Sequence, residues 1–493
     1  MEFKVGTSIK KDKTGEALLY FIFEDEHDLS QLDEETKNYI GNVTKYINLK
    51  GKLNEVKLLF PMNKNFKAIC LAGLGKKNDY KPDNLRQSAA SAAKLLKEHE
   101  ITKFSVMLKN FPEGFDDTIP QSIVEGSILG TYIFTKKTDL SSLKKPLESM
   151  TGVTEKRLVK KVIKDFDKGK IVADAVCFAR DLANIPAEEM TPVRFGEVAI
   201  ERLKNLDNVS VEVLDKKKLM ELEMGGLLAV NKGSFVPPVF VVVKYNGGKQ
   251  NEKPLAFIGK GITFDSGGID LKSWRELHEM KFDMCGAADV LAAIDGIAKL
   301  KIKRNIVGLI PLTENMIAGD AQKAGDIIKM YNKKTVEYIN TDAEGRILLA
   351  DAFSYSANFN PKALVSLSTL TGSCKIAIGT YCAAILCPDE DLKNRVIKTG
   401  KKVEELCWEL PLMPQFDKML ESRIADIANI PLVNDAMTSI GGVFLKNFAP
   451  NNVPWAHVDI CATANGVKNI PYIQEDASGW GVRLLIKLSD DWV

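Results

Sequence analysis

The chain has 493 residues, of which 45% are hydrophobic and 27% charged, a composition that is ordinary for a globular protein and excludes a disordered or collagen-like chain. Its 67 basic and 65 acidic side chains give a net charge of +2, which does not favour a dedicated nucleic-acid or membrane-surface protein. No apolar run approaches the roughly 18 residues that span a bilayer, and the charged N-terminus lacks the apolar core of a signal peptide, so we expect a cytoplasmic protein that contacts no membrane.

In the first third of the chain, apolar strand-like runs alternate with helical patterns. The runs Phe66–Ala72 and Phe104–Leu108 predict buried strands, and Ser88–Glu98 between them predicts a helix. A long helical pattern then covers Thr154–Ala183. We place a domain boundary inside this linking helix, at about 155–183, which gives domains 1–165 and 166–493.

The linking helix carries seven Lys or Arg side chains between Lys156 and Lys170. A solvated helix face is the ordinary interpretation of such a run. Contact with nucleic acid is the alternative, and it would give the protein a DNA-binding or scaffold role without catalysis.

In the rest of the chain, strands and helices alternate in the manner of an α/β fold. The predicted strands are Phe240–Tyr245, Leu255–Gly259, Asn305–Leu312, Thr335–Ile339, Ala363–Ser368 and Ala383–Cys387, and the predicted helices are Gly286–Leu300, Ile347–Ala357 and Lys393–Trp408.

The cysteines and histidines exclude the common thiolate and imidazole metal sites. The eight cysteines form no CxxC pair and the four histidines no HExxH motif, so we expect reduced, mostly buried thiols. A catalytic metal in this chain would need oxygen ligands.

Two acidic side chains, Asp342 and Glu344, lie in Asn340–Arg346 between a predicted strand and a predicted helix. In an extended chain they would point the same way and repel one another unless a cation neutralised them. A helix N-terminus that favours acidic side chains is the alternative interpretation of this stretch alone.

A second polar segment, Gly259–Gly268, is predicted as a glycine-rich loop that carries Lys260 and Asp265, with Lys272 and Asp283 downstream. For any one of these residues taken alone, a charged side chain on a solvated loop is the ordinary interpretation. Together with the acidic pair above they make four carboxylates and two lysines. Such an oxygen-rich set suits Zn²⁺, Mn²⁺, Mg²⁺ or Co²⁺, and two divalent ions would balance four negative charges.

These residues carry a resemblance to the leucyl aminopeptidase (cytosol aminopeptidase) family of dinuclear metallopeptidases. NTDAEGR at Asn340–Arg346 and GKGITFDSGG at Gly259–Gly268 are similar to the two signatures of that family, with matching spacings to Lys272 and Asp283. The resemblance extends from about residue 175 to the end of the chain and is weaker in the first third.

The resemblance implies a ligand set for two divalent ions per subunit, Zn²⁺ or Mn²⁺ with Mg²⁺ or Co²⁺ as further candidates. One ion would be held by Lys260, Asp265, Asp283 and Glu344, and the other by Asp265, Asp342 and Glu344. Lys260 would have to bind as a neutral amine, because an ammonium has no lone pair.

It also implies a mechanism, in which a hydroxide that bridges the two metals attacks the first peptide bond of a peptide with a free N-terminus. Lys272 would stabilise the oxyanion, and Arg346 would hold a bicarbonate ion that acts as general base.

The architecture implied by the resemblance is a smaller N-terminal α/β domain and a larger C-terminal catalytic domain with a central mixed sheet flanked by helices. The implied assembly is a homohexamer.

Some positions depart from the family pattern, at Glu188, Ala324 and Cys285. In the implied substrate pocket, Ala464 stands where a larger Met is frequent, so we expect a roomier pocket that accepts Leu, Met and aromatic side chains. The implied substrate-binding residues are Met280, Asn340, Thr369, Leu370, Gly372 and Ala464.

Overall fold

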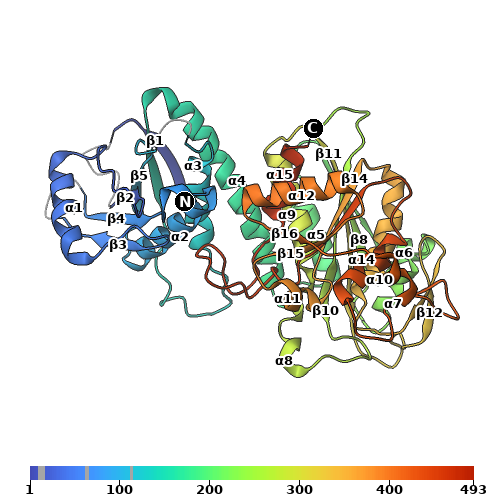
Figure 1. Ribbon diagram of the computed structural model, residues 1–493. Coiled ribbons are helices and arrows are strands. Elements are labelled where there is room, and N and C mark those ends of the chain that lie inside the picture. Colours follow the sequence, from blue (N-terminus) through green and yellow to red (C-terminus); the bar gives the residue numbers. More distant parts are fainter. Residues whose placement is uncertain (9–16, 62–65, 112–114, 493) are drawn as a thin grey trace. The chain divides into compact units, whose positions relative to one another are not determined.

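The computed structural model describes residues 1–8, 17–61, 66–111 and 115–492, and it divides into two units. Unit 1 comprises Met1–Asp174 and Lys468–Gln474, and unit 2 comprises Ala175–Val467 and Glu475–Val493. The first passage from unit 1 to unit 2 falls inside helix α4 (Val159–Asn184), which is green in Figure 1.

Within its described residues, unit 1 has a six-stranded sheet in the order β1-β6-β5-β2-β4-β3, in which only β3 is antiparallel to its neighbour. Strand β2 is buried along its whole length, because Leu19 and Phe21 face one hydrophobic core while Leu18 and Tyr20 face another. The strands are β1 (Glu2–Gly6), β2 (Ala17–Ile22), β3 (Val56–Leu59), β4 (Ala68–Gly73), β5 (Lys103–Met107) and β6 (Ser149–Val153), and the helices before α4 are α1 (Glu34–Ile47), α2 (Pro82–Glu98) and α3 (Ile119–Gly130).

The described part of unit 2 is built on a nine-stranded mixed sheet, which confirms the expected architecture. Its order is β16-β15-β18-β14-β9-β11-β8-β7, with β10 paired to β11. The central strands are parallel, while β8 and β15 are antiparallel to β11 and β18. The strands are β7 (Val209–Leu214), β8 (Val239–Asn246), β9 (Leu255–Gly259), β10 (Gly261–Asp265), β11 (Asn305–Asn315), β14 (Ala363–Ser368), β15 (Ala383–Leu386), β16 (Cys407–Glu409) and β18 (Trp455–Asp459). A smaller sheet pairs β12 (Asp326–Lys329), β13 (Thr335–Tyr338) and β17 (Ile427–Ala428).

Helices cover both faces of this sheet (Figure 1). Alternate residues of the central strands, such as Ala256 and Ile258, share one core with helices α7, α10 and α14. On the opposite face, Gly308 of β11 lies against Val290 and Ile294 of α9. The helices are α5 (Pro192–Leu203), α6 (Lys216–Glu221), α7 (Gly225–Asn231), α8 (Trp274–Leu277), α9 (Cys285–Lys299), α10 (Gly345–Tyr355), α11 (Gly372–Ile378), α12 (Glu390–Val403), α13 (Pro414–Met419), α14 (Met437–Lys446) and α15 (Val482–Asp490).

Two of the expected elements are wrong. The helix predicted over Lys393–Trp408 ends at Val403, because Glu404 has a left-handed backbone with φ 53°, and the chain then enters β16. The segment Gly259–Gly268 is not a loop throughout, because Gly261–Asp265 pairs with the end of β11 as strand β10.

None of the helices in the described part of the chain is both long and apolar enough to cross a lipid bilayer.

In the basic run at the start of α4, Lys161 lies 3.2 Å from Asp165 and 3.5 Å from Asp117. Part of the positive charge of this run is therefore paired within unit 1.

Candidate metal centre

Lys260 follows β9 and turns toward the start of helix α10. It continues the alternation of Ala256 and Ile258, which face that helix, and its side chain is 3% exposed. Its ammonium lies 2.8 Å from Asp283 Oδ2 and 3.0 Å from Glu344 Oε1, and it donates to the carbonyl of Thr369 at 3.0 Å. This lysine therefore joins three separate segments of the chain.

Asp265 ends β10 and is also buried. Its Oδ1 accepts hydrogen bonds from Asn315 Nδ2 at 2.8 Å and from the N–H of Gly267 at 2.9 Å. Its Oδ2 lies 2.9 Å from Lys272 Nζ, and the same ammonium forms an ion pair with Asp342. Lys272 therefore lies between two carboxylates, as Lys260 does.

Asp283 comes from the 3₁₀ helix η3 (Met280–Met284), which directly precedes α9. Its Oδ1 accepts a hydrogen bond from Thr369 Oγ1 at 2.7 Å. Thr369 thus contacts both Lys260, through its carbonyl, and Asp283, through its hydroxyl.

Asp342 and Glu344 lie in the turn between β13 and α10. The extended backbone expected for this pair is wrong, because the chain turns at Thr341 and Asp342, and Glu344 has helical angles of φ −74° and ψ −33°. The turn nevertheless brings the two carboxylates together with Asp265, and one oxygen from each of the three lies within 4.8 Å of the others.

The charges at this site are strongly coupled. Burial raises the pKa values of Asp283, Asp342 and Glu344 above the usual carboxyl range, and repulsion from Asp265 adds to the rise. Burial alone would lower the pKa of Lys260, but the carboxylates of Asp283 and Glu344 outweigh it and raise that pKa. The same balance raises the pKa of Lys272, through Asp265 and Glu344.

Arg346 lies in the first turn of α10 and is 2% exposed. One of its terminal nitrogens donates to the carbonyl of Asn429 at 2.9 Å, while its buried Nε has no hydrogen-bond partner among the described residues. Burial lowers the pKa of Arg346 to about 10, partly offset by Glu344 and Asp459. The guanidinium stays protonated at neutral pH and retains donors for an anion.

The donor set fits divalent cations. Three carboxylates crowd around one point, and the buried Oε2 of Glu344 has no hydrogen-bond partner within the described ranges. Hard oxygen donors that repel one another in a largely buried place are the ligands that small divalent ions stabilise.

The residues expected to bind substrate lie on several segments, and Thr369 contacts the cluster directly. Met280 begins η3, Asn340 precedes the acidic turn, and Thr369 contacts two cluster residues as above. Leu370 is half-buried, Gly372 begins α11 and is exposed, and Ala464 is buried in the segment after β18.

Two buried residues that the sequence motifs do not include also shape the site. Asp459, at the end of β18, accepts hydrogen bonds from the N–H groups of Leu370, Thr371 and Cys461 and from the Thr371 hydroxyl. Asn429 contacts the acidic turn and Arg346. Apart from Cys461, the partners of both residues lie more than 80 positions away in the chain, so neither forms a local motif.

The three residues that depart from the family pattern differ in their exposure to solvent. Glu188 and Ala324 are exposed. Cys285 is buried at the start of α9, and burial raises the pKa of its thiol well above the usual value, as expected for a packed side chain.

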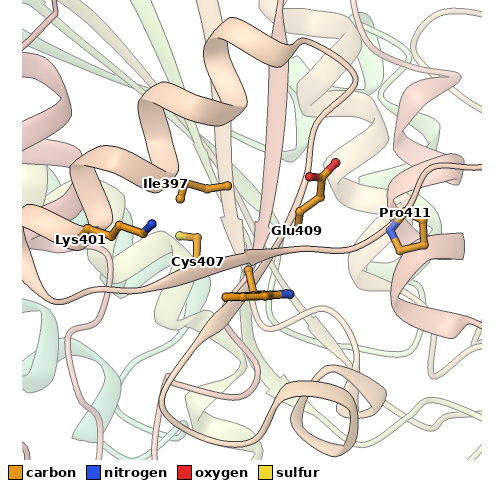
Figure 2. A pocket seen from close by; sticks show the side chains of 6 residues that line it. Ile397, Lys401, Cys407, Glu409 and Pro411 are labelled. Carbon is orange, nitrogen blue, oxygen red and sulfur yellow. The ribbon is translucent and has the colours of Figure 1, made fainter.

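Surface pockets occur away from the cluster. One of about 440 Å³ lies between α12 and β16, where Figure 2 shows Ile397, Lys401, Cys407, Glu409 and Pro411 around it. Another, of about 540 Å³, lies beside Asn447 and Phe448. Neither is lined by a residue of the cluster.

Comparison with known proteins gives consistent matches over most of the chain. The model of the cytosol aminopeptidase family, catalytic domain, matches residues 177–486, and that of the N-terminal domain matches residues 9–139. A probable cytosol aminopeptidase of Bdellovibrio bacteriovorus is 37% identical over 434 residues, covering 87% of this chain and 86% of its own. One from Syntrophotalea carbinolica is 35% identical over 499 residues, covering 99% of each. Among solved structures, the bottromycin maturation enzyme BotP in complex with Mn has a TM-score of 0.85 at 27% identity, covering 97% of this chain and 99% of that one.

Proposed function

The chain belongs to the cytosol aminopeptidase family of metal-dependent peptidases, and from this premise we propose that it removes Leu-like residues from the free N-terminus of peptides at a two-metal centre. The observation that carries the proposal is the cluster of four carboxylates, three of them buried, around two lysines.

The ligand sets proposed for the two ions follow the sequence resemblance. Lys260, Asp265, Asp283 and Glu344 would hold one ion, while Asp265, Asp342 and Glu344 would hold the other. Zn²⁺ and Mn²⁺ are the first candidates, with Mg²⁺ and Co²⁺ as further ones. The solved Mn complex of BotP, which has the same fold, supports Mn²⁺ as the first ion to test.

Divalent ions held by these residues would lower the pKa of a bound water and polarise the carbonyl of the substrate. The chain's own part is to position charge. Lys272, with its ammonium between Asp265 and Asp342, would stabilise the negative charge that develops on the carbonyl oxygen. Arg346, whose fork is fixed on one side by Asn429, would hold bicarbonate in a bidentate contact.

Specificity would come from the segments around the cluster. Asn340 and the stretch Thr369–Gly372 are proposed to bind the peptide backbone and first side chain, together with Met280. The small side chain of Ala464 would leave room for Leu and for aromatic residues.

The test is hydrolysis of the amides of Leu, Phe and Ala by purified protein, after chelation and again with Mn²⁺, Zn²⁺ or Co²⁺ restored. We expect activity that requires metal, prefers Leu over Ala, and falls by about 100-fold or more in Lys272→Ala. Lys418→Ala, which removes an exposed lysine of α13, is the matched control and should retain activity. A folded protein that is inactive with every metal would contradict the proposal.

We also propose a homohexamer in the cytoplasm, on the strength of the family resemblance. With a chain of 54.5 kDa, light scattering would then give about 330 kDa for the assembly.

A further inference from the structure

Asn429 lies just beyond strand β17 and is fully buried. Its side-chain Oδ1 accepts hydrogen bonds from the N–H groups of Ile339 at 2.8 Å and Asn340 at 3.3 Å. Its Nδ2 donates to the carbonyls of Asn340 at 2.8 Å and Ala343 at 3.5 Å. The amide therefore contacts both donors and acceptors of the turn that carries Asp342 and Glu344.

The backbone of Asn429 extends the same connection. Its N–H donates to the carbonyl of Glu337 at 2.9 Å, and its carbonyl accepts from Arg346 at 2.9 Å. One residue thus contacts the strand before the acidic turn, the turn itself and the arginine that follows it.

The other side of the turn is held by a different segment. Thr341 donates through its N–H to Asp270 Oδ2 at 2.7 Å and through its hydroxyl to the carbonyl of Gly267 at 2.6 Å. The acidic turn is therefore fixed between the Asp265–Lys272 segment and Asn429, and neither contact is made by a metal-ligating side chain.

We propose that Asn429 is a positioning residue for the metal centre, one that sets the carboxylates of Asp342 and Glu344 relative to the Arg346 guanidinium. This inference rests on the proposed function and adds to it a residue that touches neither substrate nor metal. An asparagine suits the place because its amide supplies an acceptor and a donor on one planar group.

Asn429→Asp is the sharpest variant, because the new side chain has nearly the same shape. It keeps an acceptor for Ile339 and Asn340, but its second oxygen faces two carbonyl oxygens that need a donor. We expect hydrogen exchange of residues 339–346 to become faster in the metal-free protein. We also expect Mn²⁺ affinity, measured by titration calorimetry, to fall by about 10-fold or more.

Asn305 offers a matched control. It is also buried, with Nδ2 donating to the carbonyls of Lys249 and Glu252 and Oδ1 accepting from Gly248. Asn305 begins strand β11, whereas Asn315, which donates to Asp265 of the cluster, ends that strand about 33 Å away. Asn305→Asp should lower the melting temperature without changing Mn²⁺ affinity or exchange at 339–346.

At saturating Mn²⁺ we expect Asn429→Asp to lower kcat by about 10-fold, because Asn429 contacts the acidic turn and Arg346 directly, whereas Asn305→Asp should keep the wild-type kcat. Unchanged exchange and Mn²⁺ affinity in Asn429→Asp would overturn the inference, as would equal losses in Asn305→Asp. If Asn429→Asp does not fold, Asn429→Ala is judged by the same criteria. A wild-type protein that binds no Mn²⁺ would instead contradict the proposed function, and exchange at 339–346 would still decide whether Asn429 holds the turn.

Discussion

At the scale of single residues, the close approach of Gly345 to Lys260 shows why the acidic turn ends in a glycine. A Cβ at position 345 would lie 2.6 Å from the Lys260 ammonium nitrogen. Because the obstructing atoms belong to the far end of a flexible side chain, the lysine would move rather than the backbone. Gly345 therefore leaves room for Lys260 beside Glu344 and Asp283.

Gly345→Ala should displace the Lys260 amine and lower Mn²⁺ affinity by at least about 10-fold. It should also lower the melting temperature of the metal-free protein, because the buried Lys260 then loses part of its pairing with Asp283 and Glu344. Titration calorimetry and a melting curve measure the two effects. Gly319→Ala is the control, since a Cβ there meets open space. Wild-type affinity in Gly345→Ala would show that Lys260 is not needed for binding.

The residues of the two sequence motifs were predictable because short spacings keep them together. The structure gathers Lys260, Asp265, Asp283, Asp342 and Glu344 into one cluster, although their roles as ligands stay predictions. Asn429 and Asp459 were not predictable. Their importance comes from hydrogen bonds to residues more than 80 positions away, which no local pattern records.

At the scale of elements, Asp351 of α10 joins two neighbouring segments. Its carboxylate accepts hydrogen bonds from the N–H of Leu227, in the first turn of α7, at 3.0 Å and from that of Tyr331 at 2.9 Å. Burial raises the pKa of Asp351 to about 7, against the lowering effect of these bonds. Helix α7 is thus held by a carboxyl group that burial disfavours in its charged form.

This shift predicts how stability depends on pH. An aspartate in the unfolded chain titrates near about 3.9, so between about pH 4 and pH 7 the unfolded chain loses a proton that the native state keeps. The contribution of Asp351 to the free energy of unfolding therefore falls as pH rises through this window, by up to about 1.4 kcal/mol per pH unit.

Asp351→Asn should remove this contribution. The free energy of unfolding, measured by denaturation, should fall less between about pH 5 and about pH 7 in the variant than in wild type. The variant should be less stable than wild type at both pH values. Asp207→Asn, at an exposed position, should keep the wild-type difference. Equal pH dependence in Asp351→Asn and wild type would contradict the assignment.

Strand positions were predicted best where burial is complete on both faces. Leu255–Gly259 and Ala363–Ser368 begin and end as expected, because both are mainly apolar and buried along their whole length, as suits central parallel strands. The end of α12 and strand β10 were missed for different reasons. The helix ends at a left-handed Glu404, a position without glycine, and β10 is defined only by its pairing with β11.

At the scale of the whole molecule, a short segment late in the chain belongs to unit 1. Lys468–Gln474 joins this unit although the chain before and after it belongs to unit 2. The Tyr472 hydroxyl donates to Asp83 Oδ1 at 2.8 Å, and Arg86 lies 5.7 Å from the tyrosine ring centroid while pairing with Asp83 and Glu125. All four side chains are buried. The domains expected from the sequence, 1–165 and 166–493, are each continuous and so include no such return of the chain to unit 1.

Tyr472→Phe keeps the ring and removes one donor from a buried carboxylate. A hydrogen bond to a charged group contributes about 1.5–3 kcal/mol, so amide exchange in Lys468–Gln474 should become faster by about 10-fold or more. Tyr46→Phe, which alters an 88% exposed tyrosine of unit 1, is the control and should leave exchange unchanged. Because the metal cluster lies in unit 2, Mn²⁺ affinity should stay at the wild-type value in Tyr472→Phe. Unchanged exchange in this segment would show that the hydroxyl does not hold it, whereas a loss of Mn²⁺ affinity would show that the segment influences the metal centre as well.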